Sequence, residues 1–265
     1  MRMKHKHHED SIENLIAYFR DDSEVLAVVL GGSVAKGLAR ADSDLDVLVV
    51  VTDDRIAELA GEGRLSECIH GHCTYEGGYF DVKYMPLDYL HAVAEKGSEP
   101  CRSAWLQARC LFSRVAGVEA LISRIGVFQE AERDGKMLSF YSALMLNAHY
   151  FWVVSQGNTY LRTRAATDIV LFGFRMLLQE AGVLFSCHKG LEKQIDALPE
   201  KPEAILAKSN RLLTELSDAA MRDFADAITS FIRYKPPENS SALLTRYIDD
   251  MELWWYKQRP VIAEW

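Results

Sequence analysis

The sequence of 265 residues contains no apolar run of the roughly 18 residues that a membrane-spanning helix needs. Its basic and polar beginning, MRMKHKHHEDS, lacks the apolar stretch of a secretory signal peptide, and we assign this segment no function. The 5 cysteines are too few, and odd in number, for a disulfide framework in a chain of this length. These absences predict a cytoplasmic protein with free thiols and no membrane partner.

The chain also lacks an excess of positive charge. It has 30 Lys and Arg against 38 Asp and Glu, a net charge of −8 and a pI of about 5.5. A protein that binds nucleic acid needs a basic face for the phosphates, so this balance argues against a nucleic-acid partner. The same balance suits a small cationic substrate. The sequence contains no internal repeat and no low-complexity tract.

The first half of the chain alternates helix and strand signals. Short apolar, β-branched runs are typical of buried strands, and polar caps before 3.6-residue periodicity are typical of helices. The turn signal Glu76-Gly77-Gly78 predicts a hairpin. We expect strands at 25–30, 44–51, 68–75, 79–85 and 110–113, and helices at 11–20, 33–40, 53–60 and 87–96.

The second half shows helical patterns without strands between them. The breaks fall at glycine and proline positions, which end helices. We expect helices near 117–125, 129–156, 159–182, 202–216, 218–234 and 241–257. The sequence therefore predicts an α+β fold, with a mixed sheet flanked by helices in residues 1–115 and an all-helical domain in residues 116–265.

Two aspartates open the second expected strand, in the stretch Ser43-Asp44-Leu45-Asp46. Residues i and i+2 of a strand face the same side, roughly 6.6 Å apart, so Asp44 and Asp46 point the same way. Carboxylates beside an apolar core repel each other and lose hydration, and Mg²⁺ offsets both effects. Asp81 lies in another apolar strand and joins them if the two strands are neighbours. Two metal ions held this way activate an attacking oxygen and stabilise a leaving phosphate.

A glycine-rich turn, Gly31-Gly32-Ser33, lies between the first expected strand and the helix that follows. Backbone N–H groups at a helix start bind phosphate, and glycine lets the phosphate approach closely. Gly37 allows a further close approach one turn later. Each motif alone is common in turns and solvated strand ends, but their combination in this order is specific.

The order of these motifs resembles the DNA polymerase β-like nucleotidyltransferases over roughly residues 10 to 90. The residues that match the motifs of this family are Gly31-Gly32-Ser33, Gly37, Ser43-Asp44-Leu45-Asp46 and Asp81. An α/β half followed by helices also resembles the small-molecule branch, the aminoglycoside and lincosamide nucleotidyltransferases. This second resemblance rests on architecture and length, because the helical half shows no substrate signature.

The resemblance implies a Mg²⁺-dependent enzyme of the EC 2.7.7 type with a nucleoside triphosphate as co-substrate. It implies that Gly32 and Ser33, next to Gly31, hold the β- and γ-phosphates and that Asp44 and Asp46 bind two Mg²⁺ ions. Asp81 then binds the catalytic ion and accepts the proton of the acceptor hydroxyl. Some relatives use a separate glutamate as the general base, and Glu130, Glu132 and Asp134 are the candidates here, although acidic residues at a helix start usually only favour the helix dipole.

Cationic residues are expected to face the triphosphate, although exposed surface is the simpler explanation for each single one of them. The candidates are Lys36, Arg40, Arg162, Arg164 and Lys189. Cys68-Ile-His-Gly-His-Cys73 offers soft ligands, but zinc sites usually use two separated pairs. Strand alternation predicts Cys68, His70 and His72 on one face. Trp254-Trp255-Tyr256 is interpreted as helix core or a homodimer contact, with a stacking platform as the alternative.

The sequence thus predicts transfer of a nucleoside monophosphate to a hydroxyl of a small molecule, plausibly an antibiotic, with release of pyrophosphate. One alternative keeps the chemistry and changes the acceptor to a protein side chain or an RNA 3′ end. The other is a nucleotide-binding module without catalysis, against which the intact set of Asp44, Asp46 and Asp81 argues.

Overall fold

The computed structural model describes residues 5–265 and divides them into two compact units. The first unit contains the described residues up to Gly97 together with Cys101–Val127, and the second contains Ser98–Pro100 with Phe128–Trp265. The division lies further along the chain than the expected 115/116 boundary, because helix α6 (Val118–Ile125) packs against the sheet through Leu121 and Ile122.

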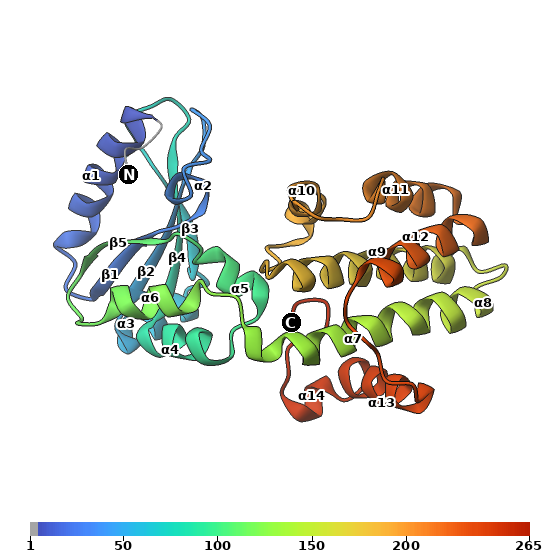
Figure 1. Ribbon diagram of the computed structural model, residues 1–265. Coiled ribbons are helices and arrows are strands. Elements are labelled where there is room, and N and C mark those ends of the chain that lie inside the picture. Colours follow the sequence, from blue (N-terminus) through green and yellow to red (C-terminus); the bar gives the residue numbers. More distant parts are fainter. Residues whose placement is uncertain (1–4) are drawn as a thin grey trace. The chain divides into compact units, whose positions relative to one another are not determined.

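A five-stranded mixed sheet forms the centre of the first unit (Figure 1). The strands lie in the order β3-β4-β2-β1-β5. β2 and β4 are parallel, and the other neighbouring pairs are antiparallel. The strands are β1 (Val25–Leu30), β2 (Leu45–Val51), β3 (Ser66–His70), β4 (Tyr79–Pro86) and β5 (Arg109–Ser113).

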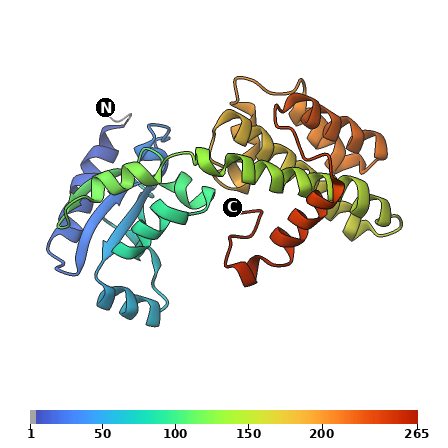
Figure 2. The same cartoon turned by 60° about the horizontal axis from the view of Figure 1, so that its bottom comes forward.

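The two faces of this sheet are covered by different helices (Figure 2). Helix α1 (Lys6–Arg20) packs Leu15 and Phe19 on one face, against Leu45 and Val47 of β2 among others. Helix α4 (Leu87–Lys96) and α6 pack on the opposite face, which includes Leu48. The period of two in β2 supplies both faces, since consecutive side chains alternate. The predicted mixed sheet flanked by helices is therefore confirmed.

Several boundaries in the first unit differ from the expectation. α1 begins at Lys6, ahead of the expected start at residue 11. Ser11 is buried, and its hydroxyl donates to the carbonyl oxygen of His7. The remaining helices of this part are α2 (Gly32–Ala35), which is shorter than expected, α3 (Asp53–Gly61) and α5 (Glu99–Ala104), which was not expected. α3 begins where the helix at 53–60 was expected, because the Thr52 side chain caps it by accepting from the backbone N–H of Arg55.

The expected hairpin strand at 68–75 is wrong in its extent. β3 ends at His70, and the chain between His70 and Tyr79 is a loop. Tyr75 in this loop donates to the carbonyl oxygen of Ser43 at 2.6 Å. This hydrogen bond attaches the loop to the segment before β2. The alternating pattern of the sequence does not predict it.

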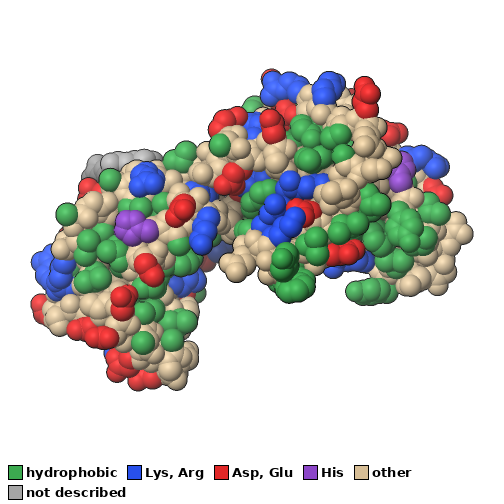
Figure 3. Space-filling view, turned by 90° about the horizontal axis from the view of Figure 1, so that it is seen from below, with side chains coloured by type: hydrophobic (Ala, Val, Ile, Leu, Met, Phe, Trp, Pro, Cys, Tyr) green, Lys and Arg blue, Asp and Glu red, His purple; other side chains and the backbone are tan. Residues whose placement is uncertain are grey.

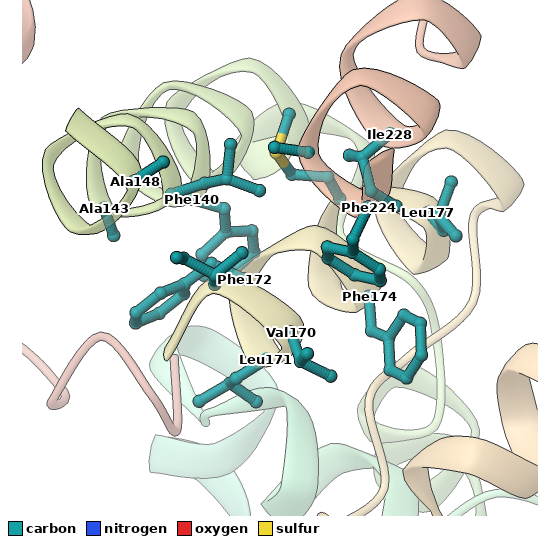
Figure 4. Packing of buried hydrophobic residues seen from close by; sticks show 14 of the residues in the cluster. Phe140, Ala143, Ala148, Val170, Leu171, Phe172, Phe174, Leu177, Phe224 and Ile228 are labelled. Carbon is teal, nitrogen blue, oxygen red and sulfur yellow. The ribbon is translucent and has the colours of Figure 1, made fainter. Parts of the chain in front are cut away.

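The second unit is helical, and helix α9 (Thr159–Ala181) runs through its core with most of its residues buried. Phe174 and Phe224 meet edge to face at 5.7 Å, and Phe140 and Phe172 lie 6.1 Å apart (Figure 4). The other α-helices of this unit are α7 (Arg133–Leu146), α8 (Trp152–Val154), α10 (Leu191–Asp196), α11 (Ile205–Glu215), α12 (Asp218–Phe231), α13 (Ser240–Met251) and α14 (Trp254–Lys257). Short 3-10 helices lie at Glu130–Glu132 and His188–Gly190, and a π-helix lies at Asn147–Phe151.

A buried charged cluster also belongs to the second unit. Glu99, which is fully buried, accepts from Lys136 at 3.0 Å and from Arg175 at 3.3 Å. The backbone N–H of Phe185 donates to the same carboxylate at 3.0 Å. Burial lowers the pKa of Arg175 to about 10, and the Glu99 carboxylate opposes this shift. Because Glu99 satisfies two buried cations, it is essential to the packing of this unit.

The aromatic residues near the end of the chain are not core. Trp254, Trp255 and Tyr256 of α14 are 38%, 65% and 72% exposed. Hydrophobic side chains are visible on the surface of the second unit in Figure 3. In residues 5–265, no helix has both the length and the apolar character needed to cross a membrane.

Candidate active site

The glycine turn follows β1 directly and leads into α2. The backbone N–H of Gly31 donates to the carbonyl oxygen of Asp46 at 2.9 Å, which ties the turn to β2. Gly32 has a φ of +62°, a conformation that favours glycine. The local sequence therefore places the Gly32 and Ser33 backbone beside the first residues of β2.

Gly32 is also required by the space around it. A Cβ built on Gly32 lies 1.6 Å from Oδ2 of Asp46, so the carboxylate occupies the space of a side chain. The backbone N–H of Ser33 hydrogen-bonds the same carboxylate. The turn and the aspartate are thus one packed arrangement.

Asp46 and Asp81 are neighbours across the two parallel strands. The register pairs Asp46 of β2 with Asp81 of β4, and the flanking pairs are Leu45 with Phe80 and Val47 with Val82. These flanking side chains are buried in the core that contacts α1. Alternation therefore directs both aspartates to the opposite face. The two strands that carry Asp46 and Asp81 are therefore neighbours, which is the condition for Asp81 to lie close to the other two carboxylates.

The neighbouring carboxylates affect the pKa of Asp46. The pKa of Asp46 is raised, first by burial and then by the negative charge of Asp44, with a smaller contribution from Asp81. The ammonium of Lys83 opposes this shift. A divalent cation offsets such repulsion, and carboxylate oxygens are the ligands that Mg²⁺ prefers. The donor chemistry and the raised pKa of Asp46 therefore fit a magnesium site.

Each carboxylate nevertheless has its own protein partner in this structure. Hydrogen bonding to Asp44 raises the pKa of the Tyr79 hydroxyl to about 12. Lys83 Nζ donates to Asp81 Oδ2 at 3.1 Å. Across residues 5–265, no group of three or more His, Cys, Asp and Glu side chains is arranged so that it could hold a metal ion. A bound cation would require these side chains to turn from their partners.

Comparison with known proteins places the turn and the aspartates within one domain. Residues 12–93 match the family described as "Nucleotidyltransferase domain". This segment is thus similar to nucleotidyltransferase domains. A search of curated protein sequences gives no match to the chain. Among solved structures, the chain is similar to a nucleotidyltransferase-like protein from Exiguobacterium sibiricum 255-15, with 12% identity, coverage of 94% of this chain and 78% of that chain, and a TM-score of 0.47.

The two cations expected near the phosphate turn of the nucleotidyltransferase domain have different surroundings. Lys36 directly follows α2, and its Nζ donates to the carbonyl oxygen of Ser103 at 3.3 Å. Arg40 is exposed and pairs with Asp42 at 3.1 Å. Lys189 lies outside this domain, in an exposed turn of the second unit. Its predicted role in nucleotide binding stays a prediction.

The other two arginines have partners within the second unit. Arg162 lies 3.4 Å from the ring centroid of Trp152 and pairs with Asp218 at 2.7 Å. Arg164 pairs with Asp168 at 2.7 Å. These contacts give both arginines a structural explanation within their own unit.

The candidate general bases are engaged to different degrees. Glu130 accepts two hydrogen bonds from the Arg133 guanidinium in a bidentate pair, at 2.7 and 2.8 Å. Glu132 pairs with the buried Lys136 at 3.0 Å. Asp134 is exposed at the start of α7. The assignment of a base among these three residues stays a prediction.

The expected shared face of the soft ligands is wrong. His70 contacts the ring of Tyr79 at 5.3 Å, whereas His72 lies against Tyr18 and Phe80, at 4.7 and 6.1 Å. Phe80 belongs to the opposite face of the sheet from Asp81. The reason is that the strand ends at His70, so alternation no longer places His72.

Sequence reasoning missed Tyr79 and Lys83 as neighbours of the aspartates. Both residues flank Asp81 at a spacing of two on β4, and this spacing is the signal that identifies them. Residues at i−2 and i+2 of a functional strand residue share its face, and Tyr79, Asp81 and Lys83 form such a row.

Proposed function

We propose that the chain is a Mg²⁺-dependent nucleotidyltransferase that moves a nucleoside monophosphate from a triphosphate to a hydroxyl of a small molecule. The observation that carries the proposal is the register of Asp46 with Asp81 beside the Gly32–Ser33 turn. Three carboxylates next to a backbone turn that accommodates phosphate suit phosphoryl chemistry and little else.

The protein groups have separate tasks in this proposal. The backbone of Gly32, next to Gly31, and the backbone and hydroxyl of Ser33 receive the β- and γ-phosphates, because backbone N–H groups at a helix start bind phosphate. Asp44, Asp46 and Asp81 hold the divalent ions. When bound, these ions neutralise the phosphate charge and favour the attack of the acceptor oxygen. Asp81 also accepts the proton of the acceptor hydroxyl.

Most of the rate enhancement in such a site comes from position and charge rather than from covalent chemistry. The rigid sheet fixes Asp46 and Asp81 through their neighbours Leu45 and Val82, which are buried. This rigidity is useful because small displacements of the reacting groups reduce the rate strongly.

Two features of the chain indicate the class of acceptor. The net charge of −8 suits a cationic acceptor, and the resemblance to the small-molecule branch rests on the helical unit that follows the sheet. Aminoglycosides and lincosamides are therefore the first acceptors to test, and antibiotic resistance is the corresponding role. The absence of a long apolar helix in the described residues and the cysteine content are consistent with a cytoplasmic enzyme.

The test is release of pyrophosphate with Mg²⁺ and each of the four triphosphates, against a panel of aminoglycosides and lincosamides. The inactive control is Asp44→Asn with Asp46→Asn. A matched control is Asp53→Asn with Asp54→Asn, which removes the same charge from two exposed aspartates of the same unit. We expect release that requires one acceptor, persists in the matched control and disappears in the first variant.

Other results distinguish the alternatives. Metal-dependent binding of triphosphate without release for any acceptor in the panel directs the search to protein side chains or RNA 3′ ends. No binding of triphosphate by the folded protein contradicts the proposal and supports a module without catalysis.

A further inference from the structure

Lys83 lies beside the proposed metal site, in contact with Asp81. It follows Asp81 by two residues on β4, so both side chains project from the same face of the sheet. Its Nζ lies 3.1 Å from Asp81 Oδ2. In the register it pairs with Leu48, two residues after Asp46 on β2.

The ammonium of Lys83 acts on two of the three carboxylates. It pairs directly with Asp81, and it opposes the rise in the pKa of Asp46 that burial and Asp44 cause. Within residues 5–265, the ion pairs formed by Asp44, Asp46 and Asp81 comprise this one contact with Lys83. Lys83 is thus the counter-ion that the protein itself supplies to the carboxylates.

This counter-ion is held loosely. The Lys83 side chain is 51% exposed and that of Asp81 is 27% exposed. Pairs between exposed side chains contribute at most about 1 kcal/mol, because water screens the charges and the long side chain loses freedom. A lysine ammonium is also a single point charge on a flexible stem, which can move away without disturbing the backbone.

We propose that Lys83 is an exchangeable counter-ion that competes with the divalent cation for Asp81. This inference rests on the proposed function, since it assumes that Asp81 is a metal ligand. Without metal, the ammonium reduces the repulsion between Asp46 and Asp81 and keeps the Asp81 carboxylate oriented. A divalent cation needs the same oxygens and repels the ammonium, so Lys83 must release Asp81 when the cation binds. Lys83 therefore lowers the affinity of the free protein for metal.

The experiment is a titration of the full chain with Mn²⁺, without nucleotide, followed by the electron paramagnetic resonance of free Mn²⁺ and by calorimetry. We expect Lys83→Gln to bind Mn²⁺ about tenfold more tightly than the parent protein, because a neighbouring positive charge is removed. Lys83→Arg keeps the charge and should retain the affinity of the parent protein within about twofold.

A matched control is Lys6→Gln. Lys6 pairs with Asp10 at 2.7 Å on the surface of α1, so its loss removes a similar exposed pair without touching the aspartates. We expect no change in Mn²⁺ affinity for this variant. Circular dichroism and thermal unfolding establish that each variant is folded.

The possible failures are distinguishable. If the parent protein binds Mn²⁺ but Lys83→Gln binds it equally or more weakly, the competition is refuted and the proposed function stands. If the Lys6→Gln control tightens binding as much, the effect is one of net charge and the inference is also refuted. If the folded parent protein binds no Mn²⁺, the proposed metal site is wrong, and the inference fails with it.

Discussion

The carboxylate of Asp46 occupies the space in which a side chain at Gly32 would lie. A Cβ at Gly32 is 1.6 Å from Asp46 Oδ2, and the φ of Gly32 is +62°. Two requirements thus coincide at one residue: a backbone conformation that favours glycine, and room for a carboxylate directly against the turn. This contact explains why the glycine turn and Asp46 at the start of β2 occur together in the sequence.

Replacement of Gly32 by alanine should therefore be severe. We expect Gly32→Ala to displace Asp46 and to reduce pyrophosphate release at least about a hundredfold, since misplaced reacting groups lose rate steeply. The matched control is Gly63→Ala, because Gly63 has a φ of +69° but no atom within 4 Å of a built Cβ. Gly63→Ala should retain full turnover and lose only the small stability that the backbone conformation costs. Equal turnover in the two variants would show that the Gly32–Asp46 contact has no role.

Asp46 should destabilise the metal-free protein at neutral pH. Its pKa is raised in the folded state by burial and by Asp44, so the folded state holds the proton more tightly than the unfolded state. The corresponding stability is present at low pH and is lost as the pH rises through the folded pKa. We expect Asp46→Asn, in the presence of a chelator, to raise the melting temperature by a few degrees at pH 7 and above, and to abolish turnover.

Differential scanning calorimetry between pH 4 and pH 8 measures this effect. The gain in melting temperature should shrink as the pH falls, because the parent carboxyl becomes protonated. A variant that is less stable than the parent protein at pH 7 would contradict the electrostatic interpretation.

Ser33 should affect triphosphate binding more than folding. Its backbone lies in the glycine turn, and its side chain is partly exposed. We expect Ser33→Ala to weaken triphosphate binding by about tenfold, the effect of losing about 1.4 kcal/mol, with little change in melting temperature. The control is Ser66→Ala, at an exposed position of β3. Calorimetric titration with a non-hydrolysable triphosphate measures the difference, and unaltered affinity in Ser33→Ala would refute a role of the Ser33 hydroxyl in holding the phosphates.

Glu99 should be required for the stability of the second unit. Its removal leaves the buried Arg175 without its carboxylate and leaves Lys136 with Glu132 only, and such a loss costs about 3–5 kcal/mol. We therefore expect Glu99→Ala to lower the unfolding midpoint of the helical unit strongly. Glu130→Ala is the control, since the Glu130 side chain is 73% exposed and its pair with Arg133 contributes at most about 1 kcal/mol. Urea unfolding followed by tryptophan fluorescence measures both, and similar midpoints would contradict the expectation.

Local features of this protein were determined by its sequence alone. The β-branched run at Val25–Leu30, the cap at Thr52 and the end of α9 before Gly182 follow from chemistry within a few residues. The same is true of Asp46, which alternation directs away from its buried neighbours Leu45 and Val47, whereas Asp44 lies just before the strand that was expected to include it. These features are predictable because turn, cap and alternation rules involve only neighbouring residues.

Only the tertiary structure decided which distant residues meet. Asp81 reaches Asp46 because β4 pairs in parallel with β2, and no local signal specifies that pairing. Glu99 lies in the core of the second unit because buried Lys136 and Arg175 need a carboxylate. Likewise, β3 ends at His70, and His72 packs against Phe80 instead of continuing the strand. In each case the outcome depends on the energy of pairing and burial between segments far apart in the chain, and local pattern carries no information about it.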